Sequence, residues 1–183
     1  MRGASLVIGL ALAGVAHLAV AATPPAASPA SPMATRGAAV FLPGAAHRPD
    51  ANVRQRAVFN LTVAPASPAA PDPGLERVAR AVTLFTASGL PTSQLDFVVL
   101  LSGGATDTAL DDSAYRARHG VANPNLGLIS QLSSVGVQLF VCGQALHARR
   151  LDGDSLAPGI AVSLSALTSV IQLQQQGYAL VPL

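Results

Sequence analysis

Cys142 is the residue of this chain whose type and setting offer the clearest chemistry, because it is the only cysteine among 183 residues. It follows the apolar run Val137–Val141 directly and precedes Gly143 and Gln144, which open a short predicted helix. A thiol beside a helix N-terminus feels the partial positive charge of unpaired N–H groups, which favours the reactive thiolate. A buried cysteine that only packs is an equally good interpretation, because free cysteines are among the most buried residues.

Three basic side chains follow the cysteine on the same predicted helix, namely His147, Arg149 and Arg150. A cation near a thiol would stabilise its anionic form. The spacing alone leaves open whether any of the three reaches the sulfur, since only the fold decides that.

A second candidate site is the loop 102–106, which follows the apolar run Leu95–Leu101. Ser102, Gly103 and Gly104 could let backbone N–H groups approach an anion, a sulfur species or the cysteine itself. The loop matches neither a Walker loop nor a dinucleotide fingerprint, so an ordinary turn between a strand and a helix is the favoured interpretation.

A third group of polar residues surrounds the start of the last predicted helix. Ser163, Ser165 and Thr168 could face a ligand there, but helix capping explains at least one of them without any function.

Several function classes lack support in this sequence. His47, His119 and His147 are far apart and there is one cysteine, so no zinc site or other metal site is predicted. No nucleophile elbow and no cofactor fingerprint is present. The basic residues are eleven scattered arginines against nine acids, and aromatic residues make up 4%, so we expect no nucleic-acid partner.

The first 21 residues resemble a secretory signal peptide. Arg2 provides the positive start, Ala4–Val20 is almost wholly apolar, and small residues stand at 19–21. A retained membrane anchor is the weaker alternative, because the segment is short for a bilayer span and contains His17. We therefore expect a periplasmic or secreted protein that leaves the membrane after cleavage. One cysteine in the mature chain excludes an internal disulfide.

The remainder divides into a leader and one domain. Residues 22–53 are rich in Ala, Pro and Ser, which predicts a flexible segment because little apolar surface is available to offset its ordering. Residues 54–183 alternate predicted strands and helices, with strands at 57–63, 95–101, 137–141, 160–163 and 178–181. Helices are expected at 73–88, 110–119, 123–135, 143–150 and from about 164 to 176. This alternation predicts an α/β domain with a mainly parallel sheet.

The domain resembles the DsrE/DsrF-like proteins of sulfur relay, in particular exported single-domain members. The resemblance rests on Asp72–Arg80, on LSGGAT at 101–106, on DSAYRARHG at 112–120, on NPNLGLISQL at 123–132, on VQLFVCGQALHARRL at 137–151, and on the final twenty residues. It implies a three-layer sandwich around a five-stranded, mainly parallel sheet, and assembly with itself into a trimer or hexamer. It also implies that Cys142, followed by Ala145, Arg149 and Arg150, occupies the position of a persulfide-carrying cysteine.

Three hypotheses for function follow. The leading one is a periplasmic protein that binds or carries sulfur at Cys142 as a persulfide, with Ser102, Gly103, Gly104, Gly143, Gln144 and Arg149 as binding residues, no cofactor, and a small sulfur species or a thiol protein as partner. The alternative is a non-catalytic oligomeric binding module in which the cysteine is structural. A thiol-based redox or small-ligand sensor is the third.

Overall fold

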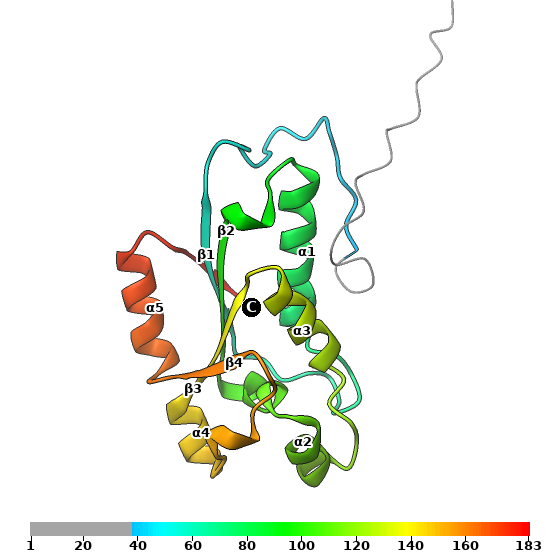
Figure 1. Cartoon of the computed structure of the whole chain (residues 1–183), viewed down its shortest axis with the longest axis vertical. Helices are drawn as coiled ribbons and strands as arrows, with labels where there is room; N and C mark the ends of the chain where they lie inside the picture. Colours follow the sequence, from blue (N-terminus) through cyan, green and yellow to red (C-terminus); the bar gives the residue numbers. More distant parts are fainter. Residues whose placement is uncertain (1–37) are drawn as a thin grey trace, which may run out of the picture.

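The sheet has five strands that all run parallel. A computed structural model describes residues 38–183. Every strand pair in it is parallel, and the spatial order is β4-β3-β2-β1-β5 (Figure 1). The predicted α/β class with a mainly parallel sheet is confirmed, and the sheet is in fact wholly parallel. The strands are β1 (Gln55–Leu61), β2 (Leu95–Leu101), β3 (Gln138–Cys142), β4 (Ile160–Ser163) and β5 (Ala179–Pro182).

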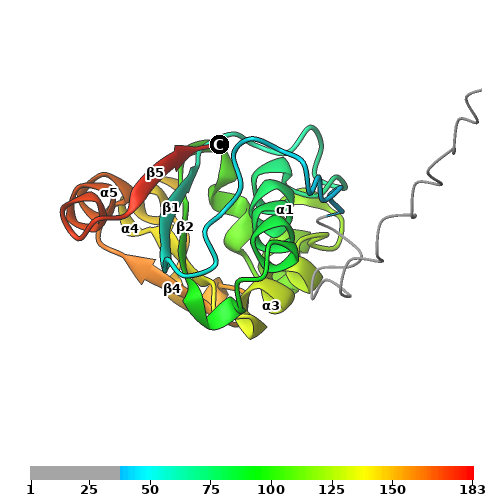
Figure 2. The same ribbon diagram turned by 90° about the horizontal axis from the view of Figure 1, so that it is seen from above.

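Helices flank the sheet, so the domain has three layers. Helices α1 and α3 cover one face, whereas α5 lies over the other, with α4 on the same side (Figure 2). Helix α2 lies below the carboxyl ends of the strands (Figure 1). No helix within residues 38–183 has the length and apolar content needed to cross a bilayer. The helices are α1 (Pro73–Ala87), α2 (Asp112–His119), α3 (Leu126–Ser134), α4 (Gly143–Arg149) and α5 (Ala166–Gln175), with 3-10 turns η1 (Thr92–Gln94), η2 (Gly103–Ala109) and η3 (Gly153–Ser155).

The larger core lies between the sheet and helices α1 and α3. Strand β2 is buried on both faces, as its apolar run predicts for a central parallel strand. Its residue Phe97 meets Phe59 and Phe85 edge-to-face, at ring-centroid distances of 5.1 and 5.5 Å. Such aromatic pairs add to the stabilisation that apolar burial provides.

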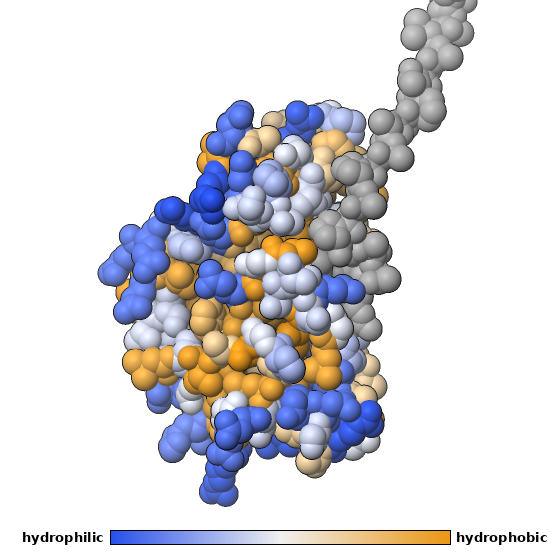
Figure 3. All heavy atoms as spheres, viewed as in Figure 1, coloured by the Kyte–Doolittle hydropathy of each residue, from blue (hydrophilic) through white to orange (hydrophobic). Residues whose placement is uncertain are grey.

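The opposite face of the sheet carries a thinner core. Its buried members are Val58, Val98, Leu100, Cys142 and Ala166. Helix α5 is the longer of the two described helices on this side, and it contacts the sheet mainly at β1 and β5. Apolar side chains are exposed on β4 and at the start of α5 (Figure 3). Leu164 is 75% and Leu167 is 71% exposed, and Ile171 is also exposed. Val162 on β4 is exposed too, but it pairs with Val141 and therefore faces the other side of the sheet from Cys142.

A buried polar network joins three segments at the carboxyl edge of the sheet. Asp72 caps α1 by accepting from the N–H groups of Gly74 and Leu75, and its other oxygen accepts from the Thr108 hydroxyl at 2.9 Å. The side-chain oxygen of Asn125 accepts from the backbone N–H of Asp72 at 2.7 Å. Burial raises the pKa of the Asp72 carboxyl above its ordinary value, against the lowering effect of these hydrogen bonds.

Several predicted boundaries are wrong. The loop expected at 102–106 enters η2, and the helix expected from 110 begins at Asp112. The helix expected from 123 begins at Leu126, because the buried side chains of Asn123 and Asn125 bind backbone groups of the preceding segment. Strands β1 and β5 are each displaced from their predicted limits by one or two residues.

The two N-terminal segments are described only in part. The predicted signal peptide and residues 22–37 of the predicted leader lie outside the described residues. Residues 38–53 of that leader contain neither a helix nor a strand and are mostly exposed.

Candidate functional site

Cys142 is the last residue of β3, and its side chain points to the face of the sheet that α5 covers. The thiol packs in the thinner core with Leu100 and Ala166, and the residue is 7% exposed. Residues two apart on a strand share a face, so Cys142 continues the row of Gln138 and Phe140 toward the carboxyl edge. The cysteine is therefore held at the junction of β3 with a helix but is almost closed to bulk solvent.

The sulfur lies at the N-terminus of α5. In the described part of the chain Sγ takes one hydrogen bond, from the backbone N–H of Ala166 at 3.3 Å. Ala166 is the first residue of this ten-residue helix, and the Ser165 hydroxyl caps it by accepting from Leu167. The first N–H groups of a helix have no partner within the helix, and they attract negative charge. The thiol therefore faces a donor suited to an anionic sulfur.

This arrangement differs from the geometry that the sequence suggested. Cys142 does stand at the N-cap position of α4, but its side chain makes no capping hydrogen bond to that helix. The sulfur turns instead toward a helix that begins 24 residues later. Strand pairing explains this, because Cys142 pairs with Ser163 and brings the start of α5 beside β3.

Gly143 and Gln144 hold the junction of β3 with α4 close to the junction of β4 with α5. A Cβ atom on Gly143 would lie 2.9 Å from the carbonyl oxygen of Ser163, closer than real Cβ atoms come to backbone. The Gln144 side-chain amide donates to the carbonyl of Leu164 at 3.2 Å. The Ser163 hydroxyl donates to the carbonyl of Val141 at 3.3 Å. Glycine at 143 thus permits the close approach that sets the sulfur beside Ala166.

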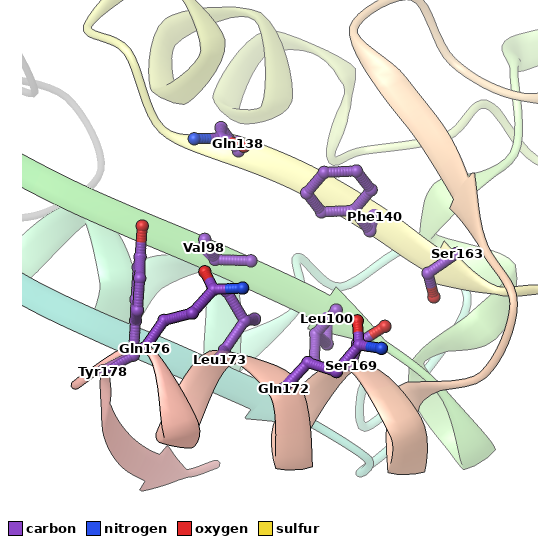
Figure 4. Close-up of a pocket in the computed structure, with 10 residues that line it drawn as sticks. All are labelled: Val98, Leu100, Gln138, Phe140, Ser163, Ser169, Gln172, Leu173, Gln176 and Tyr178. Carbon is purple, nitrogen blue, oxygen red and sulfur yellow. The ribbon is translucent and has the colours of Figure 1, made fainter.

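A groove lies between β3 and α5, and one end of it is lined by Ser163, the strand partner of Cys142 (Figure 4). We call it the β3–α5 groove, and its cavity volume is about 240 Å³. Ser169 lines the groove, and Ala166 lies about one helical turn before it on α5. The contact of Cys142 with Ala166 is therefore just outside the groove, at the end where Ser163 lies. Its lining residues are Val98, Leu100, Gln138, Phe140, Ser163, Ser169, Gln172, Leu173, Gln176 and Tyr178.

The structure places Arg149 in a separate cluster. Its guanidinium donates to the carbonyl of Gly103 at 2.5 Å and to the Asp107 carboxylate at 2.9 Å. The same carboxylate pairs with Arg118 at 3.1 Å and His119 at 3.0 Å. These pairs tie η2, α2 and α4 together and occupy the guanidinium away from the sulfur. His147 and Arg150, also expected as candidates, are exposed.

Gly103 and Gly104 allow the backbone at the start of η2 to pack closely against the backbone of residues 61–64. The N–H of Gly104 donates to the carbonyl of Thr62 at 2.8 Å, and the N–H of Ser102 donates to the carbonyl of Leu61 at 3.0 Å. A Cβ atom on Gly104 would come within 2.6 Å of the backbone nitrogen of Ala64. Because these two N–H groups already have partners, they are not free to receive an anion.

A second cavity, of about 220 Å³, lies beside the Asp107 cluster. It is lined by Gly104 and Arg149 together with Tyr115 and His119. The predicted binding residues therefore fall into two sets, with Gly143 and Gln144 near the thiol and Gly103, Gly104 and Arg149 near this cavity. Asp107 was not singled out in the sequence, because its partners on α2 and α4 are 11 to 42 residues away.

Metal ligands are not clustered in the described residues. Within residues 38–183 no group of three or more His, Cys, Asp or Glu side chains could hold a metal ion.

Of the three polar residues at the start of α5, Ser165 caps the helix, Ser163 binds Val141 and the Thr168 hydroxyl donates to the carbonyl of Ser165 at 3.1 Å. Local hydrogen bonds thus account for all three hydroxyls.

Comparisons with known proteins identify a family and a similar solved structure. Residues 56–183 match the family model described as DsrE/DsrF-like family, and this range includes Cys142 and all of the five strands except Gln55. A solved structure of a protein of unknown function from Methanobacterium thermoautotrophicum is similar, with 20% sequence identity and a TM-score of 0.49. That likeness covers 70% of this chain and 99% of the other. A search of curated proteins found no match.

Proposed function

This chain belongs to the DsrE/DsrF-like family, which is associated with sulfur transfer, and on that basis we propose that Cys142 binds sulfur and carries it as a persulfide. The observation that carries the proposal is the hydrogen bond from the Ala166 N–H to Sγ at a helix N-terminus. A donor there stabilises a sulfur anion, and the thiolate is the nucleophile of sulfur chemistry.

The proposed transfer needs no outside oxidant. The Cys142 thiolate attacks a sulfane sulfur of the donor, a new S–S bond forms, and the donor's own S–S bond breaks as its remainder leaves as an anion. An acceptor thiolate then attacks the outer sulfur of the persulfide. The bond to Sγ breaks, and the electron pair returns to the Cys142 thiolate.

Mass spectrometry of the intact protein tests the proposal. After incubation with sodium tetrasulfide, the mass should increase by whole sulfur atoms, and the added sulfur should disappear on treatment with a small thiol. Cys142→Ser should take up none. Absence of added sulfur on the wild-type protein, or equal uptake by the variant, would contradict the proposal.

We also propose that the protein acts outside the cytoplasm, after removal of residues 1–21. The charged start, apolar core and small residues of that segment support export. Cell fractionation and N-terminal sequencing of the mature protein would test this. A cytoplasmic protein that retains Met1 or begins at Arg2 would refute it.

The exposed apolar face supports the further proposal that the chain assembles with itself. Monomers seldom expose contiguous apolar surface, and Leu167 and Ile171 lie one turn apart on α5 and are both exposed, as is Leu164 just before that helix. If this face binds a second copy, Leu167→Glu should reduce the sedimentation coefficient to that of a monomer. The exposed substitution Val40→Glu, in a segment far from α5 (Figure 1), is the control.

A non-catalytic module with a structural cysteine is the competing function, and the 7% exposure of Cys142 favours it. It predicts slow alkylation of the folded protein and rapid alkylation once the chain is unfolded. Rapid alkylation of the native thiol would exclude this alternative.

A further inference from the structure

Among residues 38–183, no charged side chain lines the β3–α5 groove. Its floor is apolar, with Leu100, Phe140 and Leu173 as members, and its rim carries carboxamides and hydroxyls. Of the described residues that line it, Tyr178 alone has a titratable side chain. The groove is thus a neutral surface, and one end of it is lined by the strand partner of a buried thiol.

An ion pair stands at the Gln176 end of the groove. Arg56 donates to the carbonyl of Gln176 at 3.3 Å and pairs with Asp96 at 3.4 Å. At the carboxyl edge, Arg149 is bound to Asp107 and Gly103. Both guanidinium groups thus have partners, and neither arginine is among the residues that line the groove.

The neutrality of the groove bears on which sulfur compounds it can hold. An oxyanion such as thiosulfate would lose water of hydration there and gain no counterion, which is costly. An uncharged chain or ring of sulfur atoms has little hydration to lose and gains from apolar contact. The volume of about 240 Å³ is below the roughly 300–1,000 Å³ of sites for drug-sized ligands, so the ligand is compact.

We infer that the β3–α5 groove takes uncharged sulfane sulfur, a ring or chain of zero-valent sulfur atoms, and presents one end of it to Cys142. This inference rests on the proposed function, because it assigns the donor class for the same thiol. It adds selectivity: the groove favours neutral sulfur over sulfur oxyanions.

The reaction balances within the groove. The Cys142 thiolate, having lost its proton to solvent, attacks one atom of a sulfur ring, and a bond forms between Sγ and that atom. One S–S bond of the ring breaks, and its electron pair moves to the far end of the opened chain as a terminal anion. Gln138 and Gln176 lie at the end of the groove away from Ser163, where their carboxamides can solvate that charge (Figure 4).

The test compares two donors on the whole protein. Cys142 is exposed either to elemental sulfur in a cyclodextrin carrier or to sodium thiosulfate, and intact mass is followed over time. We expect loading from elemental sulfur to be at least tenfold faster. Ser169→Phe, which places a ring in the groove, should slow that loading at least fivefold, whereas Thr168→Phe on the exposed side of α5 should leave it unchanged.

The possible results distinguish the donor class inferred for the groove from the sulfur-carrying function proposed for Cys142. Equal or faster loading from thiosulfate overturns the donor class but leaves Cys142 as a sulfur carrier. Fast loading from elemental sulfur that Ser169→Phe does not slow, in a variant whose thermal unfolding shows that it folds, overturns the groove as the route. If elemental sulfur, thiosulfate and tetrasulfide all leave Cys142 unmodified, the proposed function itself fails.

Discussion

Gly143→Ala should loosen the packing around the Cys142 thiol and make it more accessible. The added Cβ would lie 2.9 Å from the Ser163 carbonyl oxygen, 3.2 Å from a methyl carbon of Val162 and 3.4 Å from the Leu164 carbonyl oxygen. Two of these neighbours are backbone, which cannot rotate away as a flexible side chain can. The junctions of β3 with α4 and of β4 with α5 must therefore separate by several tenths of an ångström.

The magnitude follows from two opposing effects. Forcing an extra carbon into a packed site costs about 1–3 kcal/mol. Replacing glycine with alanine in a helix stabilises it by about 0.5–1 kcal/mol. We expect a net loss of about 1–2 kcal/mol of unfolding free energy. Because Sγ and the Ala166 N–H belong to the two separating junctions, the hydrogen bond of 3.3 Å should lengthen and the thiol should become more accessible.

The assay pairs denaturant unfolding with the rate of alkylation by iodoacetamide below the unfolding transition. Gly127→Ala is the matched control, since Gly127 lies in α3, is exposed, and has no atom within 4 Å of an added Cβ. That control should stabilise the protein by about 0.5–1 kcal/mol and leave alkylation unchanged. If Gly143→Ala is as stable as Gly127→Ala and its thiol reacts at the wild-type rate, the close approach does not position the sulfur.

Three further predictions concern the polar network, the ion pairs and the core. Burial raises the pKa of the Asp72 carboxyl above 3.8, so the folded protein holds that proton more tightly than the unfolded chain does. The unfolding free energy should therefore fall as pH rises from about 4 through the raised pKa. In thermal melts across that pH range, Asp72→Asn should flatten this slope. Arg149→Gln should cost about 1 kcal/mol in chemical unfolding but leave alkylation of Cys142 unchanged, and faster or slower alkylation would show that the guanidinium acts on the sulfur. Phe97→Leu should cost about 1–3 kcal/mol through loss of two edge-to-face contacts, and thermal unfolding at the wild-type temperature would contradict that.

The order of strands and helices could be predicted from the sequence because each signal is local. The apolar run Leu95–Leu101 marks a central parallel strand, and Asp72 with Pro73 marks the start of α1. Each of these features can be recognised from the few residues around it. The boundary at Leu126 was missed because Asn123 and Asn125 bind groups that only the folded chain brings near.

The thiol site was predictable in part for the same reason. The residues on either side of Cys142 predict that it ends a strand and precedes a helix. Its hydrogen bond to Ala166 is not, since that contact depends on the pairing of β3 with β4. The separation of Arg149 from the sulfur likewise depends on Asp107, whose position is set by η2.

The place of β5 has a consequence for how the chain folds as it is made. Strand β5 pairs with β1, the first strand, and Leu183 exchanges backbone hydrogen bonds with Asn60 and Thr62. During synthesis, one edge of β1 therefore stays open until more than 120 residues after it have emerged. An open strand edge can pair with another chain, so a nascent or truncated form that stops after Gly177 should need protection from aggregation.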